Sequence, residues 1–95
     1  MTKKTARLVR KLDWKTDAAL YKLSEPVEFR NTADDKNTTD YVIASAVIAF
    51  DHGGEECLIF PAKENGETWS MLDIGGRRGT MSHETVLWNL GFSLE

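Results

Sequence analysis

Residues 73–80 concentrate the residue types that bind anions. They read Asp-Ile-Gly-Gly-Arg-Arg-Gly-Thr and lead directly into the start of a predicted helix. Glycines let backbone N–H groups converge, a helix start adds unpaired N–H groups, and arginine side chains offer planar forks for phosphate or carboxylate. Because the spacing matches neither common glycine-rich nucleotide fingerprint, an ordinary solvated turn is the competing interpretation. The candidate anion-binding residues are Gly75, Gly76, Arg77, Arg78, Gly79 and Thr80.

Two histidines and one cysteine complete the reactive side chains. His52 and His83 lie near acidic residues, but no spacing among them and Cys57 is typical of a metal site. The run Ser82-His83-Glu84 contains the residue types of a catalytic triad, yet neighbours on a helix point in different directions and cannot form a relay. The sequence therefore predicts no catalytic residue, no metal site and no cofactor.

Length, composition and charge indicate one domain over residues 1–95. The chain is 41% hydrophobic and 28% charged, which is ordinary for a globular protein. Residues 1–15 hold six basic and one acidic side chain, and the other eighty hold six basic and fourteen acidic ones. This basic segment is predicted to be a solvated arm or an edge strand. It could reach nucleic acid, although the acidic body disfavours that partner.

The targeting signals of the chain are weak. No apolar segment of a signal peptide follows the basic start, and the uncharged apolar run over residues 41–50 is about half of what a membrane helix needs. We therefore expect a cytoplasmic protein without a membrane partner. The pair Leu94-Glu95 is typical of a cloning remnant, and whether it is native stays open.

Three strands are predicted in the second half of the chain. Residues 41–50 and 57–62 are rich in β-branched and aromatic side chains, and residues 68–74 return after an Asn65-Gly66 turn. These segments predict a meander over residues 41–74. Before them, residues 18–23 favour a strand over a short helix, Pro26 is expected to end it, and residues 31–40 are expected to form an exposed loop.

The C-terminal helix carries the strongest local signals. Ser82 is a suitable N-cap, Gly91 fits the left-handed position after the last turn, and Phe92 can fold back onto Leu87. A helix over about residues 83–90, within the element 82–91, is therefore predicted to pack on one face of the sheet.

The predicted strand over residues 41–50 is apolar on both faces, so both faces need a cover. One short helix covers only one of them. The N-terminal segment, a second copy of the chain or a partner protein would have to cover the other. The tryptophans are either core residues or interface anchors. The interface candidates are Tyr41, Ile43, Val47, Trp69 and Trp88.

The order of these segments resembles a group of small proteins of tailed bacteriophages, chiefly those that infect actinobacteria. The resemblance covers about residues 40–92, from Asp40-Tyr41-Val42 through Leu58-Ile59-Phe60-Pro61 to the helix that starts at Ser82. Such proteins generally have no assigned activity, and the resemblance transfers no functional residues. It implies a role in binding and redirecting a host protein, as in host takeover or anti-defence.

Together these features predict an α+β fold: a small antiparallel sheet of three to five strands with one C-terminal helix on one face. The predicted function is that of a phage-encoded, non-enzymatic binding protein in the cytoplasm of the host cell. Its partner would be a host bacterial protein, a second copy in a homodimer, or both. The alternative function is binding of a small anion or nucleic acid at the loop 75–80.

Overall fold

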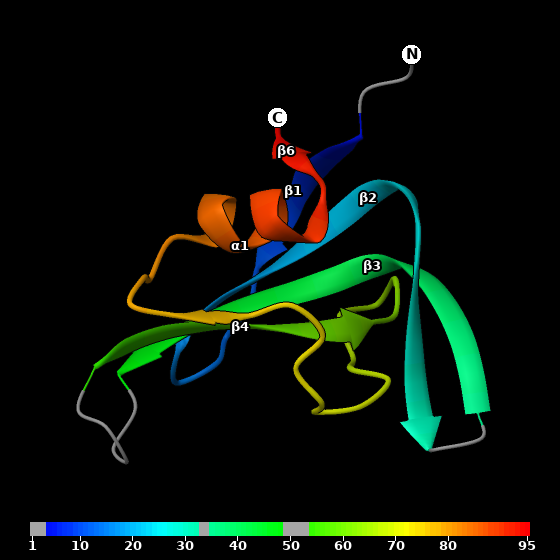
Figure 1. Ribbon diagram of the computed structural model, residues 1–95, viewed down its shortest axis with the longest axis horizontal. Helices are drawn as coiled ribbons and strands as arrows, with labels where there is room; N and C mark the ends of the chain where they lie inside the picture. Colours follow the sequence, from blue (N-terminus) through cyan, green and yellow to red (C-terminus); the bar gives the residue numbers. More distant parts are fainter. Residues whose placement is uncertain (1–3, 33–34, 49–53) are drawn as a thin grey trace.

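A mixed, strongly curved sheet with one short helix on it makes up the fold. The computed structural model describes residues 4–32, 35–48 and 54–95 (Figure 1). Its elements are β1 (Thr5–Lys11), β2 (Asp17–Thr32), β3 (Asp35–Ile48), β4 (Glu55–Ala62), β5 (Arg77–Arg78), α1 (His83–Leu90) and β6 (Ser93–Leu94). The strand order is β5-β4-β3-β2-β1-β6, and only the β1–β6 pair is parallel. The α+β class is confirmed, but the predicted antiparallel sheet of three to five strands is a mixed sheet of six. The count is higher because both edges carry a strand of two residues.

The long β2–β3 hairpin replaces a predicted strand end and a predicted loop. Pro26 does not end β2, which runs for 16 residues. Pairing with β3 shifts between Lys22 and Val27, and Pro26 lies within that shift. A bulge leaves backbone groups outside the ladder, so the missing N–H of proline costs no ladder bond there. The polar residues 35–40, expected in a loop, instead form the first part of β3.

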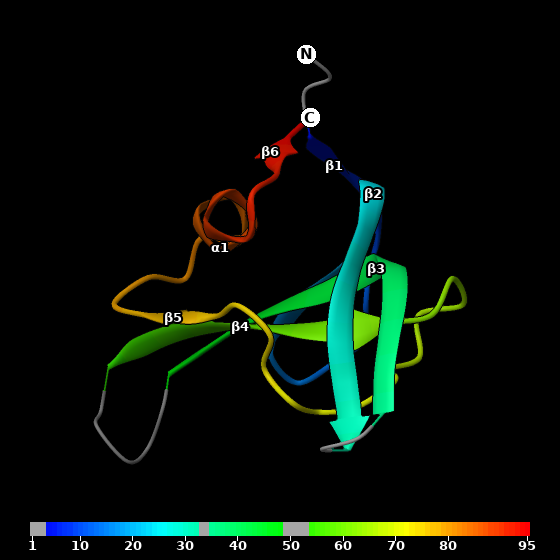
Figure 2. The ribbon, with the colours of Figure 1, turned by 45° about the vertical axis from the view of Figure 1, so that its right-hand side comes forward.

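The far end of this hairpin bends away from the rest of the sheet (Figure 2). Its strands stay paired from Val27 with Thr39 to Arg30 with Lys36. Phe29 is buried in this part of the hairpin and lies against Trp69, with 6.0 Å between ring centroids. Backbone pairing and this packing therefore outweigh the low strand propensity of the polar residues.

The prediction of a strand over residues 68–74 is wrong. These residues form irregular chain that covers the outer edge of β4. Only Thr68 forms a bridge, with Ala62. Farther along, the Trp69 N–H donates to the Pro61 carbonyl at 2.8 Å, and the Ile74 N–H donates to the Ile59 carbonyl at 2.8 Å. The Asn65-Gly66 turn before this segment is confirmed, since Gly66 has φ +92° and donates to a carbonyl three residues earlier.

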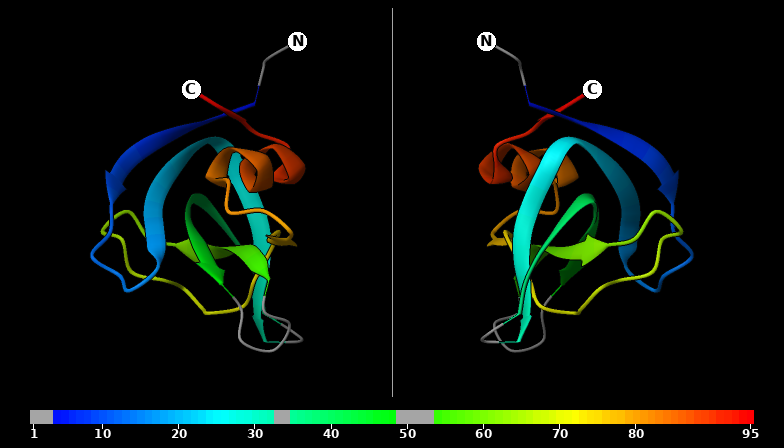
Figure 3. Two further views of the ribbon diagram at one scale, coloured as in Figure 1. Left: turned by 90° about the vertical axis from the view of Figure 1, so that its left-hand side faces the viewer. Right: turned by 90° about the vertical axis from the view of Figure 1, so that its right-hand side faces the viewer.

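Helix α1 begins and ends where its caps predict. The Ser82 hydroxyl accepts from the Thr85 N–H at 3.2 Å, Gly91 is left-handed at φ +107°, and the Phe92 N–H donates to the Leu87 carbonyl at 2.9 Å. Figure 3 shows the helix on one side of the sheet, and Leu87 lies in a core cluster with Ile59 of β4. The sheet face under α1 is therefore buried within the chain.

The opposite face is covered by the segment between β1 and β2. Leu12 and Trp14 pack against the buried residues of this face, and the ring of Trp14 lies 6.2 Å from that of Phe60. The buried members of this second cluster are Ala18, Leu20, Ile43 and Ala62. Of the three covers that the sequence left open, the N-terminal segment is the one observed.

Trp14 and Trp88 differ in burial, so substitution of each one tests this packing. Trp14→Ala should lower the free energy of unfolding by about 2 kcal/mol, because it uncovers the second face. Trp88→Ala should change it by less than about 0.5 kcal/mol, because that side chain is exposed. Urea unfolding followed by circular dichroism measures both values, and equal losses would contradict the assigned cover.

Candidate functional site

The loop over residues 73–80, rich in glycine and arginine, is held in place by the carboxylate of Asp73. Asp73 Oδ1 accepts hydrogen bonds from the backbone N–H groups of Gly76 at 2.7 Å, Ile59 at 2.9 Å and Gly75 at 3.2 Å. A Cβ atom on Gly76 would lie 2.4 Å from the Cys57 carbonyl oxygen, so this close approach requires glycine. The amides expected to receive an external anion therefore already bind an internal one.

Other groups of this loop also have partners within the chain, among them the Gly79 N–H, which donates to the Glu55 carbonyl at 2.7 Å. The guanidinium of Arg77 donates to the side-chain oxygen of Asn89 at 3.1 Å, and Arg77 and Arg78 pair with β4 as strand β5. At the helix start, the Ser82 N–H donates to the Thr80 hydroxyl at 3.0 Å. The structure thus brings the predicted anion-binding residues into one loop, but the amides of Gly75 and Gly76 are satisfied within the chain.

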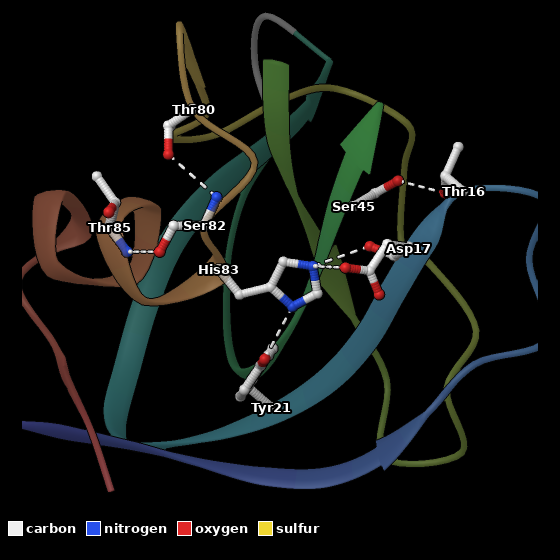
Figure 4. Close-up of polar contacts among 8 residues, drawn as sticks. All are labelled: Thr16, Asp17, Tyr21, Ser45, Thr80, Ser82, His83 and Thr85. Atoms are coloured by element: carbon white, nitrogen blue, oxygen red, sulfur yellow. Dashed lines mark hydrogen bonds and ion pairs between the residues drawn. The ribbon is translucent and has the colours of Figure 1, made fainter. Parts of the chain in front are cut away.

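A polar cluster that the sequence did not reveal ties α1 to β2 (Figure 4). His83 Nδ1 lies 2.8 Å from the Tyr21 hydroxyl, and Nε2 lies 2.8 Å from the Asp17 carbonyl oxygen. With the ring proton on Nε2, the imidazole donates to Asp17 and accepts from Tyr21. The Asp17 carboxylate lies 3.8 Å from the same nitrogen, and Thr16 bonds Ser45 nearby at 2.6 Å.

This cluster has the chemistry of a structural link rather than a reactive centre. Both ring nitrogens of His83 have protein partners, and its side chain is 12% exposed. Tyr21 is buried, and that burial, followed by the negative charge of Asp17, raises the pKa of its hydroxyl. A buried, protonated phenol is neither an accessible nucleophile nor a ready metal ligand.

Metal binding finds no support among the residues that the structure describes. No group of three or more His, Cys, Asp or Glu side chains there is placed to hold an ion. His52 and Asp51 lie outside the described residues. Cys57 is fully buried, and burial, followed by the charges of Asp17 and Asp73, raises the pKa of its thiol to about 11. The thiol is therefore protonated at neutral pH.

The interface candidates divide between core and surface. Ile43 is 0% exposed in the second-face cluster, so in this fold it cannot contact a partner as expected. Tyr41 and Val47 are half-buried, and the Lys22 ammonium lies 4.6 Å from the Tyr41 ring centroid. Trp69 and Trp88 are exposed, at 45% and 67%.

Trp88 borders a groove between α1 and β6. The groove is lined by Trp88, Glu84 and Thr85 of the helix and by Ser93 and Leu94 of β6. Trp69 differs, because its ring contacts Phe29 and carries the Lys63 ammonium 4.8 Å from its centroid. Trp88 has no aromatic or cationic neighbour of this kind among the described residues. We refer to this surface as the Trp88 groove.

No family model, curated protein or solved structure matches the chain. Among the described residues, no helix has both the length and the apolar character needed to span a membrane.

The role of Asp73 gives a stability prediction. Asp73→Ala should lower the free energy of unfolding by about 1–3 kcal/mol, because three backbone N–H groups lose their acceptor. Asp73→Asn keeps an acceptor oxygen and should lose less. Chemical unfolding of the two variants measures the difference, and an Asp73→Ala variant as stable as the parent would contradict the assigned role.

The burial of Cys57 gives a prediction of reactivity. At pH 7–8 a disulfide reagent such as DTNB should label Cys57 only in denaturant, because the folded thiol is buried and protonated. The raised pKa also predicts stability that is complete below pH 9 and falls as pH rises toward about 11, since the unfolded thiol ionises first. Rapid labelling of the native protein at pH 7 would be the contrary result.

Proposed function

We propose that this chain is a non-enzymatic binding protein of a tailed bacteriophage that acts on a host protein in the host cytoplasm. The observation that carries the proposal is Trp88, which is 67% exposed beside the groove between α1 and β6. A large exposed aromatic side chain at a groove is typical of a protein-binding anchor, because it adds much contact area at little entropic cost.

The rigid surroundings of Trp88 support this role. The Ser82 cap fixes the start of α1, the Gly91–Phe92 closure fixes its end, and buried Leu87 anchors the turn that carries Trp88. A side chain presented by a fixed helix loses little freedom on binding. The groove is therefore a preorganised surface rather than a product of a loose terminus.

Other apolar side chains extend the exposed surface beyond this groove. Trp69, Met71 and Leu72 are exposed in the irregular segment beside β4, and Ile48 and Met81 are exposed near the start of α1. These scattered residues are less specific, because single exposed apolar side chains are normal on a protein surface. A homodimer was expected as one possible cover of the second sheet face. Leu12 and Trp14 cover that face within the chain, so this reason for a homodimer no longer applies.

The test compares tagged variants in pull-downs from a bacterial host lysate, with and without nuclease treatment. We expect the parent protein to retain one host protein at near-equal amount, and Trp88→Ala to reduce its recovery at least about tenfold, as for an anchor residue. Leu72→Ala is the matched control, because Leu72 is 57% exposed but lies outside the groove.

Circular dichroism and a thermal melt of each variant separate lost binding from lost folding. Equal recovery of the partner by Trp88→Ala and the parent would contradict the proposed anchor. Recovery of nucleic acid alone, or of a second copy alone, would contradict a host protein as the partner.

A further inference from the structure

Strand β1 leaves most of one sheet edge open. On its inner side β1 pairs with β2 from Ala6 to Lys11, whereas on its outer side β6 pairs only with Thr5 and Ala6. In the described part of the chain, nothing pairs with the outer side from Arg7 to Lys11. We refer to this stretch as the open edge.

The direction of the backbone groups along this edge follows from one hydrogen bond. The Glu95 N–H donates to the Ala6 carbonyl at 2.8 Å, so the backbone groups of Ala6 face outward. Backbone groups alternate along an antiparallel strand, which turns the N–H and C=O of Leu8 outward too. Leu8 is 46% exposed, so a second chain could reach these groups.

The side chains of the open edge are basic on both faces of the sheet. Lys11 lies opposite Ala19, whose side chain is in the cluster under α1, and Arg10 lies opposite Leu20 of the other cluster. Arg7, Arg10 and Lys11 are all exposed. Arg7 and Lys11 form no ion pair with any residue that the structure describes, and Arg10 donates to the Asn65 carbonyl.

These charges disfavour a second copy of the chain at the open edge. Two copies of β1 paired antiparallel about Val9 would set Arg7 of one opposite Lys11 of the other. Like charges directly opposite each other in a sheet are destabilising. An acidic segment would instead place carboxylates opposite the same basic side chains.

The edge also carries features that restrict indiscriminate pairing. The register of the β1–β2 pair shifts between Leu8 and Arg10, and this shift is a β-bulge. Basic side chains flank the bulge. Bulges and edge charges are the usual protection of a sheet edge against aggregation. The opposite edge differs, because the outer edge of β4 already has partners in β5 and in the irregular segment that contains Asp73.

We propose that the open edge of β1 binds an extended acidic segment of a partner protein, which adds to the sheet as a further strand. Backbone hydrogen bonds at Leu8 supply part of the affinity, and Arg7, Arg10 and Lys11 select acidic side chains. The inference rests on the proposed function, since it names the chemistry of the bound protein segment, but its site is not the Trp88 groove.

The test uses a peptide of about eight residues that alternates glutamate and valine, with blocked ends, as the probe. Two-dimensional NMR of the full chain should show shifts concentrated at residues 7–11 and slower hydrogen exchange of the Leu8 amide. The matched lysine–valine peptide should not bind. A single-stranded oligonucleotide forms the third arm, because phosphates are the competing anionic ligand.

Leu8→Pro removes the outward N–H and no β1–β2 hydrogen bond, so it should weaken the glutamate–valine peptide about tenfold. Leu8→Ala keeps the N–H and should bind within about threefold of the parent. If Leu8→Pro does not fold, the double variant Arg7→Glu/Lys11→Glu replaces it and should bind the lysine–valine peptide instead. Arg77→Glu/Arg78→Glu, an equal charge change at the opposite edge, should leave peptide preference unchanged.

Absence of peptide binding, or binding that Leu8→Pro and the charge reversal leave intact, would overturn the open-edge site. So would an oligonucleotide that shifts residues 7–11 while the glutamate–valine peptide does not. Host-protein recovery lost in Trp88→Ala but kept in Leu8→Pro and in the charge reversal would support the proposed function while rejecting the edge. The converse pattern would support the edge and reject the Trp88 anchor.

Discussion

Because β3 lies in the middle of the sheet with apolar side chains on both faces, the chain must supply two separate covers. Val42 and Ala44 face the cluster under α1, and Ile43 faces the cluster with Leu12 and Trp14. Uncovered, either face would expose apolar surface that favours association over a stable monomer. The two covers come from opposite ends of the sequence, so packing of β3 joins both ends into one structure.

The two sheet edges are completed in different ways. After α1 the chain pairs with β1 through Ser93 and Leu94. At the opposite edge, a carboxylate completes what strand pairing does not, since Asp73 accepts the N–H of Ile59 in place of a backbone carbonyl. Internal side-chain chemistry thus satisfies one edge. At the other edge, backbone groups between basic side chains have no partner strand among the residues that the structure describes.

The sequence predicted those elements whose signals are local. Ser82 and Gly91 define α1, because each cap acts within one turn, and residues 41–48 and 57–62 form strands as their β-branched content indicates. The failures were non-local: residues 35–40 pair across a hairpin that overrides their polarity. The His83–Tyr21 contact joins residues 62 positions apart and left no local signal, whereas Asp73 preceding two glycines was a usable sign of an internal acceptor.

Strand β6 lies between the Trp88 groove and the open edge, because it lines the groove and pairs with Thr5 and Ala6, directly before Arg7. A strand added along Arg7–Lys11 would continue the outer row that Ser93 and Leu94 begin, on the same side of the sheet. Attraction at this basic edge and apolar contact at Trp88 are complementary, since charge guides encounter and buried aromatic area slows release. Acidic side chains outnumber basic ones in the rest of the chain, which would disfavour binding of an acidic segment elsewhere on the surface.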